Sequence, residues 1–423
     1  MDFLQELAWR NMLHQQTPGI KEELEKGMVT GYIGFDPTAP SLTIGNFVQL
    51  QLLKLFQLSG HQPIVLMGGA TGRVGDPSGK DAERQLKSYE EIEHNLQFQA
   101  KQARKFLDFE NGPNKALLLN NYDFYREMNV LDFLRNVGKT LTVNYMSSKE
   151  SVKKRIETGI SFTEFSYQLL QAYDFQCLYQ QYNCRIQMGG SDQWGNITSG
   201  TEFIRKNLDA KAYAVTTPLL TKADGTKFGK SESGNIWLDP ELTSPYDFYQ
   251  FWIRASDADM KSFIRYFTLK SKEEIEALET DFADQPNKLK EALAEELTTR
   301  VHSAEALEAA KNVSNLLFRK VNKDTLLSLD ASSLETVARE IKSFEVDRSL
   351  IEQGVNIGDL MTEHTNMLAS KGEVRRAIKG NALSVNKDKI ASHEDRVNQE
   401  ALLHGRFIMI ENGKKNKYIV VVN

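Results

Sequence analysis

Short apolar runs alternate with helical patterns through the first half of the chain, and this alternation most constrains the fold. Residues 32–35 are typical of a strand that enters the loop Asp36-Pro37-Thr38, and a helical pattern rich in Leu and Phe follows over residues 45–59. Residues 63–67 are typical of a second buried strand, which opens into the glycine-rich loop 68–75. Strands that alternate with helices predict an α/β fold with a parallel sheet. Ligands of such folds bind beyond the carboxyl ends of the strands.

The later parts of the chain follow other patterns. From about residue 243 to residue 321, glycine is scarce and Glu, Lys, Ala and Leu are frequent, which predicts a helical region. The periodicity then weakens while charge persists, which favours a linker before a small mixed domain. We therefore expect a parallel-sheet domain, a helical domain that begins with a lysine-rich loop, a linker and an α+β domain, over residues 1–226, 227–321, 322–346 and 347–423 in that order.

Composition excludes several classes of protein. Apolar residues make up 40% of the 423 residues and charged residues 26%, which is typical of a globular chain. No apolar run approaches the roughly 18 residues that a membrane-spanning helix needs, and the N-terminal segment does not resemble a secretory signal. The two cysteines (Cys177 and Cys184) exclude a disulfide scaffold or a thiolate metal site, and the seven histidines form no metal-ligand cluster. We therefore expect a cytoplasmic protein with no metal site of its own.

Charge is distributed unevenly along the chain. From Lys371 to Asn423, eleven Lys or Arg residues stand against six Asp or Glu residues, a balance of +5. Since the whole chain carries −5, the other 370 residues carry −10. This asymmetry predicts an acidic body with a basic C-terminal module, and a solvated charged face is the alternative explanation.

Two glycine-containing loops invite comparison with phosphate-binding motifs, and both depart from them. The loop 68–75 lacks the Gly-x-Gly-x-x-Gly spacing of dinucleotide-binding folds. The segment 224–231 (DGTKFGKS) nearly matches a P-loop, but Asp224 occupies the position of the first glycine. Two lysines and a serine on this loop could still hold polyphosphate charge, and an ordinary solvent-exposed loop is the alternative.

Residues 162–182 predict one long helix with an unusual polar face. Tyr167, Gln171 and Asp174 recur at positions i, i+4 and i+7 of an otherwise apolar segment. This face is either a solvent-exposed stripe or the wall of a pocket for a small polar ligand. Asp192 and Gln193, which follow an expected strand and are flanked by glycines, suit ribose hydroxyls or an ammonium group, with an ordinary turn as the alternative.

Taken together, five segments of the chain resemble the bacterial-type tyrosyl-tRNA synthetases, which are class I aminoacyl-tRNA synthetases. Their order and spacing fit that family over nearly the whole chain. The segments are GFDPTAPSL (34–42), GGATGRVGDPSGK (68–80), GISFTEFSY (159–167), GGSDQWGNIT (189–198) and KFGKS (227–231). The resemblance implies a Rossmann-like catalytic domain, then a helical domain and a small α+β RNA-binding domain. It also implies a tyrosine–tRNA ligase, which forms tyrosyl-adenylate from tyrosine and ATP and transfers the tyrosine to its cognate tRNA.

The resemblance assigns a role to each matching residue. Tyr32 and Asp174 are expected to hold the phenol hydroxyl of tyrosine. The residues expected around the ammonium group are Asp76, Tyr167 and Gln171. The residues expected beside the amino acid and the adenylate are Asp36, Gln187 and Gln193. The residues expected to bind ATP are Gly45, Asp192 and Lys230. The residues expected to stabilise the departing pyrophosphate are Thr38, Thr43, Asn46, Lys80, Arg84, Lys227, Lys230 and Ser231. ATP is expected as a substrate that carries Mg²⁺ with it, and no prosthetic group is expected.

One segment departs from the family. Where the class I signature usually has His-x-Gly-His, this chain has Thr43-Ile44-Gly45-Asn46. The side-chain amide of Asn46 can donate a hydrogen bond much as a histidine nitrogen would, whereas the hydroxyl of Thr43 has a shorter reach. A lost hydrogen bond to a charged phosphate costs about 1.5–3 kcal/mol. Thr43 therefore either contacts ATP or merely fills space.

The C-terminal segment 369–386 looks like a small RNA-binding domain that the family shares with a ribosomal small-subunit protein. Three basic residues recur there every four positions, which places them on one face of a helix. The residues expected to contact tRNA are Lys371, Arg375, Arg376, Lys379, Lys414 and Lys415, with Lys417 adding charge and a solubilising helix as the alternative. The candidates on the acceptor side of the tRNA are Lys149, Arg205 and Lys206.

Tyrosine, ATP and cognate tRNA are thus the expected partners, and the resemblance implies a homodimer that does not bind a membrane. Two other interpretations stay open. An RNA-binding descendant that has lost amino-acid activation would explain Thr43 and Asn46. A tryptophan-activating relative would share most motifs, although Tyr32 with Asp174 favours a phenol as the ligand.

Overall fold

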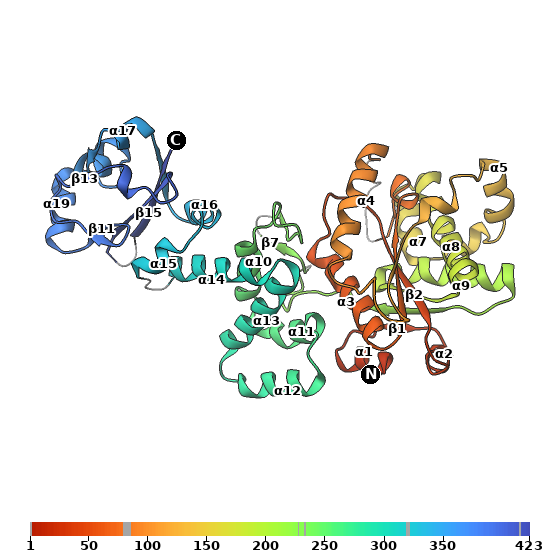
Figure 1. Cartoon of the computed structure of the whole chain (residues 1–423). Coiled ribbons are helices and arrows are strands. Elements are labelled where there is room, and N and C mark those ends of the chain that lie inside the picture. The colour runs from red at the N-terminus through yellow and green to blue at the C-terminus, as the bar shows by residue number, and fades with distance from the viewer. Residues whose placement is uncertain (1, 79–85, 227, 232–233, 319–321, 414–415) are drawn as a thin grey trace. The chain divides into compact units, whose positions relative to one another are not determined.

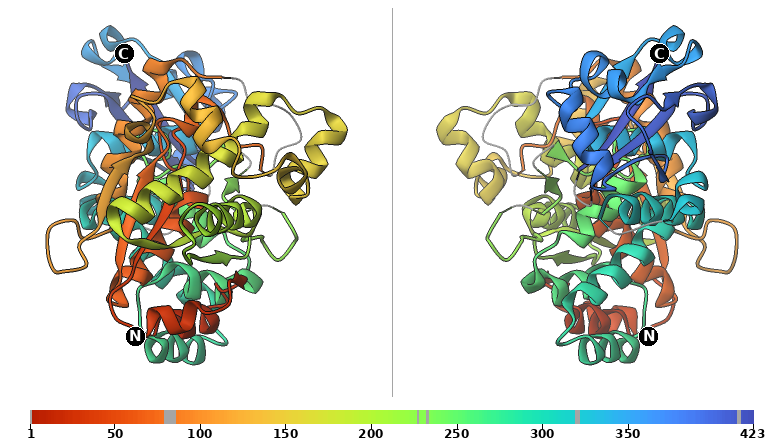
Figure 2. Two further views of the ribbon diagram at one scale, coloured as in Figure 1. Left: turned by 90° about the vertical axis from the view of Figure 1, so that its right-hand side faces the viewer. Right: turned by 90° about the vertical axis from the view of Figure 1, so that its left-hand side faces the viewer.

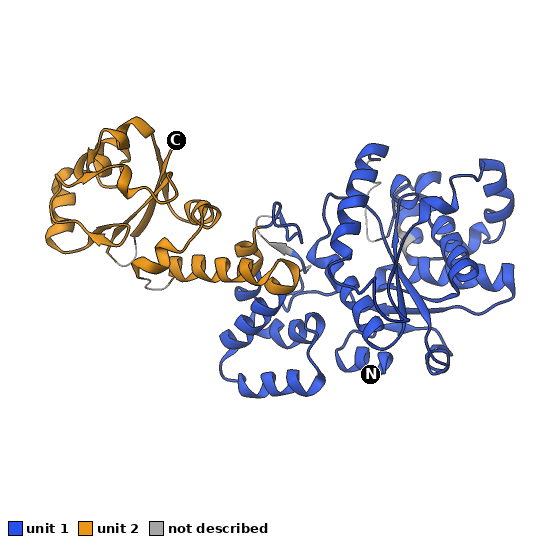
Figure 3. Ribbon diagram, viewed as in Figure 1, with its two compact units in different colours: residues 1–243, 251–297 blue, residues 244–250, 298–423 orange. Residues whose placement is uncertain are grey.

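A computed structural model of the chain describes residues 2–78, 86–226, 228–231, 234–318, 322–413 and 416–423 (Figure 1). It divides into two compact units (Figure 3). Unit 1 comprises residues 1–243 and 251–297, and unit 2 comprises residues 244–250 and 298–423. Among the helices of these described residues, none is long and apolar enough to cross a membrane.

Unit 1 is built on a six-stranded sheet with the strand order β1-β6-β5-β2-β3-β4. Five of its strands run parallel, and the short strand β1 pairs with β6 in the antiparallel sense. In chain order the strands are β1 (Gln15–Gln16), β2 (Thr30–Phe35), β3 (Gln62–Met67), β4 (Leu117–Asn120), β5 (Cys184–Gly190) and β6 (Tyr213–Thr217). The expected parallel sheet is confirmed. The chain leads from β2 to β3 on one side and from β5 to β6 on the other, so the carboxyl ends of β2 and β5 form a switch point, where ligands of α/β sheets bind.

Helices cover both faces of this sheet. Figure 1 shows α3 (Ile44–Leu58) and α4 (Tyr89–Ala103) on one side, and α8 (Phe162–Tyr182) and α9 (Trp194–Leu208) on the other. Helix α8 has the predicted bounds, because the Ser161 side chain accepts a hydrogen bond from the backbone N–H of Glu164 and Asn183 ends the helix in the left-handed conformation. The smaller elements of unit 1 are α1 (Phe3–Trp9), α2 (Ile20–Leu24), α5 (Val130–Asp132), α6 (Val143–Ser147), α7 (Glu150–Thr158), β7 (Lys230–Ser231), β8 (Gly234–Asn235), α11 (Asp257–Phe267) and α12 (Lys272–Asp281).

The region expected to be helical is helical. Helices α10 (Pro245–Ile253) and α13 (Pro286–Val301) contribute residues to both units, and α14 (Ala304–Phe318) belongs to unit 2. Unit 2 continues with a five-stranded sheet of order β12-β11-β14-β15-β9 and a two-stranded sheet of β10 and β13. Its strands are β9 (Ser343–Val346), β10 (Val355–Asn356), β11 (Leu383–Val385), β12 (Asp388–Lys389), β13 (Arg396–Val397), β14 (Phe407–Asn412) and β15 (Asn416–Val422). Its remaining helices are α15 (Lys323–Leu327), α16 (Ala331–Glu340), α17 (Arg348–Glu352), α18 (Ile357–Asp359) and α19 (Lys371–Lys379). This is the expected α+β composition.

The interval 322–346, which the sequence suggests is a linker, contains α15, α16 and β9. Strand β9 pairs in parallel with β15 and forms an edge of the C-terminal sheet. The apolar periodicity of this interval is weak because its helices are short and bury few large side chains, among them Leu326, Leu334 and Val337. These contacts favour a C-terminal domain that begins before residue 347.

Candidate active site

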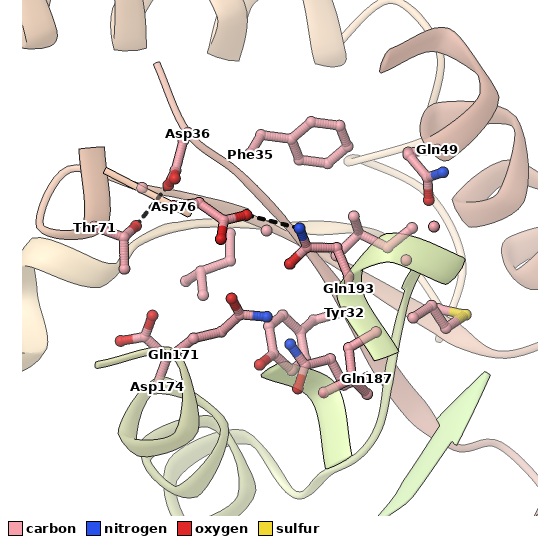
Figure 4. Close-up of a pocket in the computed structure, with 18 of the residues that line it drawn as sticks. Tyr32, Phe35, Asp36, Gln49, Thr71, Asp76, Gln171, Asp174, Gln187 and Gln193 are labelled. Atoms are coloured by element: carbon pink, nitrogen blue, oxygen red, sulfur yellow. Dashed lines mark hydrogen bonds between the residues drawn. The ribbon is translucent and has the colours of Figure 1, made fainter. Parts of the chain in front are cut away.

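A cavity of about 320 Å³ lies in unit 1 at the carboxyl ends of β2 and β5 (Figure 4). Its walls come from β2 and the loop after it, the start of α3, the glycine-rich loop, α8, and β5 with the turn that follows. The expected site residues that line it are Tyr32, Asp36, Thr38, Gly45, Asn46, Asp76, Tyr167, Gln171, Asp174, Gln187, Asp192 and Gln193. The polar face of α8 is therefore a pocket wall and not a solvent-exposed stripe.

One end of the cavity is a buried pair of acidic and phenolic side chains. Tyr32 and Asp174 are 1% and 2% exposed. The Asp174 carboxylate accepts hydrogen bonds from Asn121 Nδ2 at 2.9 Å and from the Tyr125 hydroxyl at 2.7 Å. The Tyr32 hydroxyl has no hydrogen-bond partner among the described residues. Because a buried polar group without a partner is costly, this hydroxyl favours a ligand with a polar group at this end.

Burial raises the pKa of Asp174 to about 7, although the hydrogen bonds from Tyr125 and Asn121 oppose the shift. The geometry accommodates a proton on this carboxyl group. The Tyr125 hydroxyl lies 2.7 Å from Asp174 Oδ1 and 2.8 Å from the Leu170 carbonyl oxygen, and it has a single proton to donate. When Asp174 is protonated, it can donate to Tyr125, which then donates to Leu170. An asparagine at this position would imitate that arrangement.

We therefore expect the Asp174→Asn variant without substrate to be more stable than the unsubstituted protein at pH 8, with a smaller difference near pH 5. A folded-state pKa of about 7 lies above the unfolded value of about 3.9. Between these values the folded state holds a proton that the unfolded state has lost, so stability falls as pH rises through this interval and is constant above it. Thermal unfolding from pH 5 to pH 8 measures the effect. Glu241→Gln, which replaces an exposed carboxylate, is the control, and a difference independent of pH would contradict the prediction.

Two further carboxylates, Asp36 and Asp76, line the same cavity. Asp36 accepts hydrogen bonds from the Thr71 hydroxyl at 2.6 Å and from the Tyr167 hydroxyl at 2.8 Å. Gly68 makes this packing possible, because a Cβ atom there would lie 2.1 Å from Asp36 Oδ1. Figure 4 shows Gln193 facing Asp76, and Gln193 Nε2 donates to this carboxylate at 2.7 Å.

The arrangement suits an ammonium group. Two carboxylates supply negative charge, and Gln171 Oε1 and Gln187 Oε1 are buried without a hydrogen-bond partner among the described residues. Acceptor oxygens without donors indicate a ligand that donates hydrogen bonds.

The start of α3 forms the third part of the site. A helix N-terminus presents backbone N–H groups to anions, and among the described residues an added Cβ atom at Gly45 would come within 4 Å only of Thr43 Oγ1. The segment after the lysine-rich loop pairs with this helix start, since Ile44 N–H donates to the Ile236 carbonyl oxygen at 2.9 Å. At Gly229 a Cβ atom would approach Ile44 to 3.0 Å. The start of α3 and the end of the lysine-rich loop, which are both expected to contact phosphates, are therefore neighbours. Thr43 itself is absent from the residues that line the cavity.

Several expected residues cannot be placed in this way. Lys80, Arg84, Lys227, Lys414 and Lys415 lie outside the described residues. Lys230 and Ser231 form strand β7, whose backbone pairs with β8, but their side chains are not among the described parts of the chain.

In unit 2, the basic residues of α19 are exposed at the surface, with Val374 buried beneath them. Lys371 forms an ion pair with Glu363 at 2.8 Å and another with Asp359, whereas the Arg376 side chain is 77% exposed. Lys417, which the sequence suggests adds surface charge, turns inward. Its Nζ atom donates to the carbonyl oxygens of Leu316 and Leu317, in the last turn of α14.

On the acceptor side, Lys149 and Lys206 both approach the Tyr145 ring, with Nζ 4.2 and 5.8 Å from its centroid. Arg205 and Lys206 both pair with Glu202, at 2.8 and 3.8 Å. The structure thus brings all three candidates together.

Sequence reasoning missed Asn121 and Tyr125, which hold Asp174. Neither belongs to a recognised motif. The available signal was position, because Asn121 directly follows β4 and polar residues at the carboxyl ends of parallel strands tend to line ligand sites.

Comparison with known proteins identifies the family. A model described as tRNA synthetases class I (W and Y) matches residues 24–319. The chain belongs to the class I tRNA synthetases. A second model, for the tyrosine–tRNA ligase SYY-like C-terminal domain, matches residues 333–421 of this synthetase. The resemblance to bacterial tyrosyl-tRNA synthetases is therefore confirmed, as is the expected fold class.

Relatives of this synthetase agree. It is 53% identical to the tyrosine–tRNA ligase of Cytophaga hutchinsonii and 50% identical to that of Bacteroides fragilis, over the full length of each chain. Among solved structures, a C-terminally truncated mitochondrial tyrosyl-tRNA synthetase of Aspergillus nidulans is 28% identical, with a TM-score of 0.67 over 75% of this chain and 94% of its own. A tyrosyl-tRNA synthetase of Archaeoglobus fulgidus, complexed with L-tyrosine, shares the fold at 17% identity, with a TM-score of 0.53 over 72% of this chain and all of its own.

Proposed function

We propose that this synthetase is a tyrosine–tRNA ligase, which activates tyrosine with ATP and transfers it to the 3′ end of its cognate tRNA. The observation that carries the proposal is the buried pair of Tyr32 and Asp174 at one end of a cavity that also reaches the start of α3. A phenol hydroxyl fits between an ionisable carboxylate and a hydroxyl that lacks a partner among the described residues. The names of the relatives agree with this assignment.

In the first step, a carboxylate oxygen of tyrosine bonds to the α-phosphorus of ATP, and the bond between that phosphorus and the bridging oxygen breaks, which releases pyrophosphate. A carboxylate is already ionised at neutral pH, so the protein needs no general base. Its tasks are to align the reactants and to stabilise negative charge on the phosphates.

Under this proposal the described residues divide these tasks. Tyr32 and Asp174 orient the phenol, while Asp36 and Asp76 with their partners Tyr167 and Gln193 hold the ammonium end. Gln171 and Gln187 accept hydrogen bonds along the amino acid. Thr38, Gly45, Asn46 and Asp192 line the part of the cavity left for the nucleotide. Lys80, Arg84, Lys227, Lys230 and Ser231 keep their proposed role at the departing pyrophosphate.

The proposal extends to the metal ion, the compartment and the tRNA. Mg²⁺ enters with ATP and neutralises its phosphates, and no prosthetic group takes part. The reaction takes place in the cytoplasm. The basic face of α19 is proposed to bind tRNA through phosphate contacts, and Lys149 and Lys206, which meet at the Tyr145 ring, are proposed to contact its acceptor end.

The test is exchange of labelled pyrophosphate into ATP, measured separately with tyrosine, tryptophan and phenylalanine. We expect rapid exchange with tyrosine alone, because only tyrosine gives Asp174 a hydroxyl partner. Exchange with tryptophan would favour the tryptophan-activating relative. No exchange with any amino acid at saturating concentration, combined with binding of tRNA, would favour an RNA-binding descendant.

We also propose a homodimer, as the family resemblance implies. Large apolar side chains around α5 are exposed to solvent, namely Val130 (69%), Leu131 (72%) and Leu134 (48%). Figure 2 shows the segment around residues 130–160, in yellow, projecting from the rest of unit 1. Exposed apolar clusters of this kind are typical of protein interfaces.

We expect the double variant Val130→Glu/Leu131→Glu to be a monomer at concentrations at which the unsubstituted protein is a dimer, because the substitutions bury charge in the interface. Sedimentation velocity measures the change. Met28→Glu, at a residue that is 54% exposed in another part of unit 1, is the control. A dimer that survives the double substitution would place the interface elsewhere.

A further inference from the structure

The residues that replace the histidines of the class I signature bond to each other. Thr43 precedes α3, and Asn46 is the third residue of that helix. The Thr43 hydroxyl donates to Asn46 Oδ1 at 2.8 Å, and the Thr43 backbone N–H donates to the same oxygen at 2.9 Å. The Asn46 backbone N–H in turn donates to Thr43 Oγ1 at 3.4 Å. The two side chains therefore form a closed helix cap, in which the only proton of the Thr43 hydroxyl is used.

This cap separates the roles of the two residues. Asn46 lines the cavity, whereas Thr43 is absent from its lining. Since Asn46 Oδ1 accepts both hydrogen bonds from Thr43, the Nδ2 group is the part of the amide left for a ligand. An Nδ2 group donates hydrogen bonds, which is the polarity that phosphate oxygens require.

Thr43 is fixed from the other side as well. It forms an isolated antiparallel bridge with Trp237, and the flanking residue Leu42 accepts a hydrogen bond from Leu238 N–H at 2.9 Å. These contacts hold the Thr43 backbone, and the hydrogen bond to Asn46 Oδ1 holds its hydroxyl away from the cavity lining.

We propose that Thr43 is a positioning residue, which never contacts ATP and instead holds the Asn46 amide with its Nδ2 group toward the phosphates. This inference rests on the proposed function and refines it. In place of the two histidine side chains of the signature, a single amide, that of Asn46, donates to the nucleotide. The Thr43 side chain sets the orientation of that amide.

A double-mutant cycle in the full-length protein tests the proposal by tyrosine-dependent pyrophosphate exchange. The variants are Thr43→Val, Asn46→Ala and the combination of both, with Thr43→Ser as the conservative variant. We expect Asn46→Ala to lower kcat by about 10- to 150-fold, the range for one lost hydrogen bond to a charged group, with the KM for tyrosine unchanged. Thr43→Val is expected to lower kcat in the same way but less, and Thr43→Ser to restore it.

The double variant shows whether Thr43 acts only through Asn46. If Thr43 acts only through Asn46, the double variant has the kcat of Asn46→Ala, because no amide remains to be positioned. If the two losses multiply, Thr43 contributes independently and the proposal is overturned. Circular dichroism at the assay temperature verifies that each variant is folded, and Thr43→Ala replaces Thr43→Val in the cycle if the valine variant is not. An unsubstituted protein without tyrosine-dependent exchange would overturn the proposed function as well, whereas multiplied losses in an active enzyme overturn this inference alone.

Discussion

The Asp174→Ala variant is expected to lose tyrosine-dependent activation by about 10²- to 10⁴-fold in kcat/KM. A hydrogen bond to a charged group contributes about 1.5–3 kcal/mol, and a buried donor left without an acceptor costs about 1–3 kcal/mol more. The substitution removes the carboxylate that is proposed to accept from the substrate hydroxyl, which leaves that buried donor without its acceptor. Asn121 Nδ2 and the Tyr125 hydroxyl also lose one hydrogen bond each, although they keep Thr71 Oγ1 and the Leu170 carbonyl oxygen as acceptors. Steady-state pyrophosphate exchange at varied tyrosine and ATP concentrations measures the loss.

The loss should fall on tyrosine and leave the KM for ATP nearly unchanged, because Asp174 lies at the end of the cavity away from the start of α3. Tyr125→Phe is a graded control, since it removes one hydrogen bond to Asp174 and keeps the carboxylate. We expect it to cost about 10-fold, in line with one hydrogen bond of about 1.5 kcal/mol. An Asp174→Ala variant that binds tyrosine normally and turns over slowly would show that the phenol lies elsewhere.

A chain that ends at Phe318 is expected to retain tyrosine-dependent exchange and to lose transfer to tRNA by roughly 100-fold or more in kcat/KM. The cavity lies wholly within unit 1, so adenylate formation does not require the tail. Binding through two linked surfaces exceeds either one alone by roughly 10²- to 10⁴-fold, and the truncation removes one of them. The cut precedes α15 because a cut at residue 349 would leave β9 without β15.

A full-length variant separates loss of contact from loss of a domain. Arg375→Glu/Arg376→Glu/Lys379→Glu reverses the charge of α19 without touching the buried Val374. We expect it to show much of the same loss in aminoacylation, strongest at low salt, since added salt weakens the phosphate contacts of the unsubstituted protein and so reduces the difference. Because Lys417 bonds to the last turn of α14, the truncated chain also needs a check of its folding by thermal unfolding. Normal aminoacylation by the truncated chain and by the triple variant would show that the C-terminal domain has no role in tRNA recognition.

The sequence predicts much of this fold because its local signals agree with one another. Helix α8 begins at a serine cap and ends at a left-handed asparagine, so both boundaries are locally encoded. The interval 322–346 was harder, because β9 is stabilised by β15, more than 70 positions along the chain, and a pairing at that distance leaves no periodic pattern.

The contrast between local signals and long-range pairing also explains which site residues could be predicted from the sequence. Its motif residues gather because they follow adjacent parallel strands, whose carboxyl ends share one edge. Asn121 and Tyr125 were missed because they reach Asp174 across 53 and 49 positions and carry no motif, and the one signal was the place of Asn121 directly after β4. The resemblance placed Thr43 among the residues at the departing pyrophosphate and left open whether it contacts ATP or fills space. Its hydroxyl bonds locally to Asn46, as threonines at helix starts commonly do.

The cavity of the synthetase contains oxygen atoms of Tyr32, Gln171 and Gln187 that lack partners among the described residues. A bound tyrosine molecule can form hydrogen bonds with these buried oxygen atoms and so stabilise the folded protein. Resistance to heat should therefore rise with amino-acid concentration. The rise in melting temperature on adding tyrosine then measures recognition of the amino acid without ATP or tRNA. Phenylalanine, which lacks the hydroxyl oxygen, should raise the melting temperature far less.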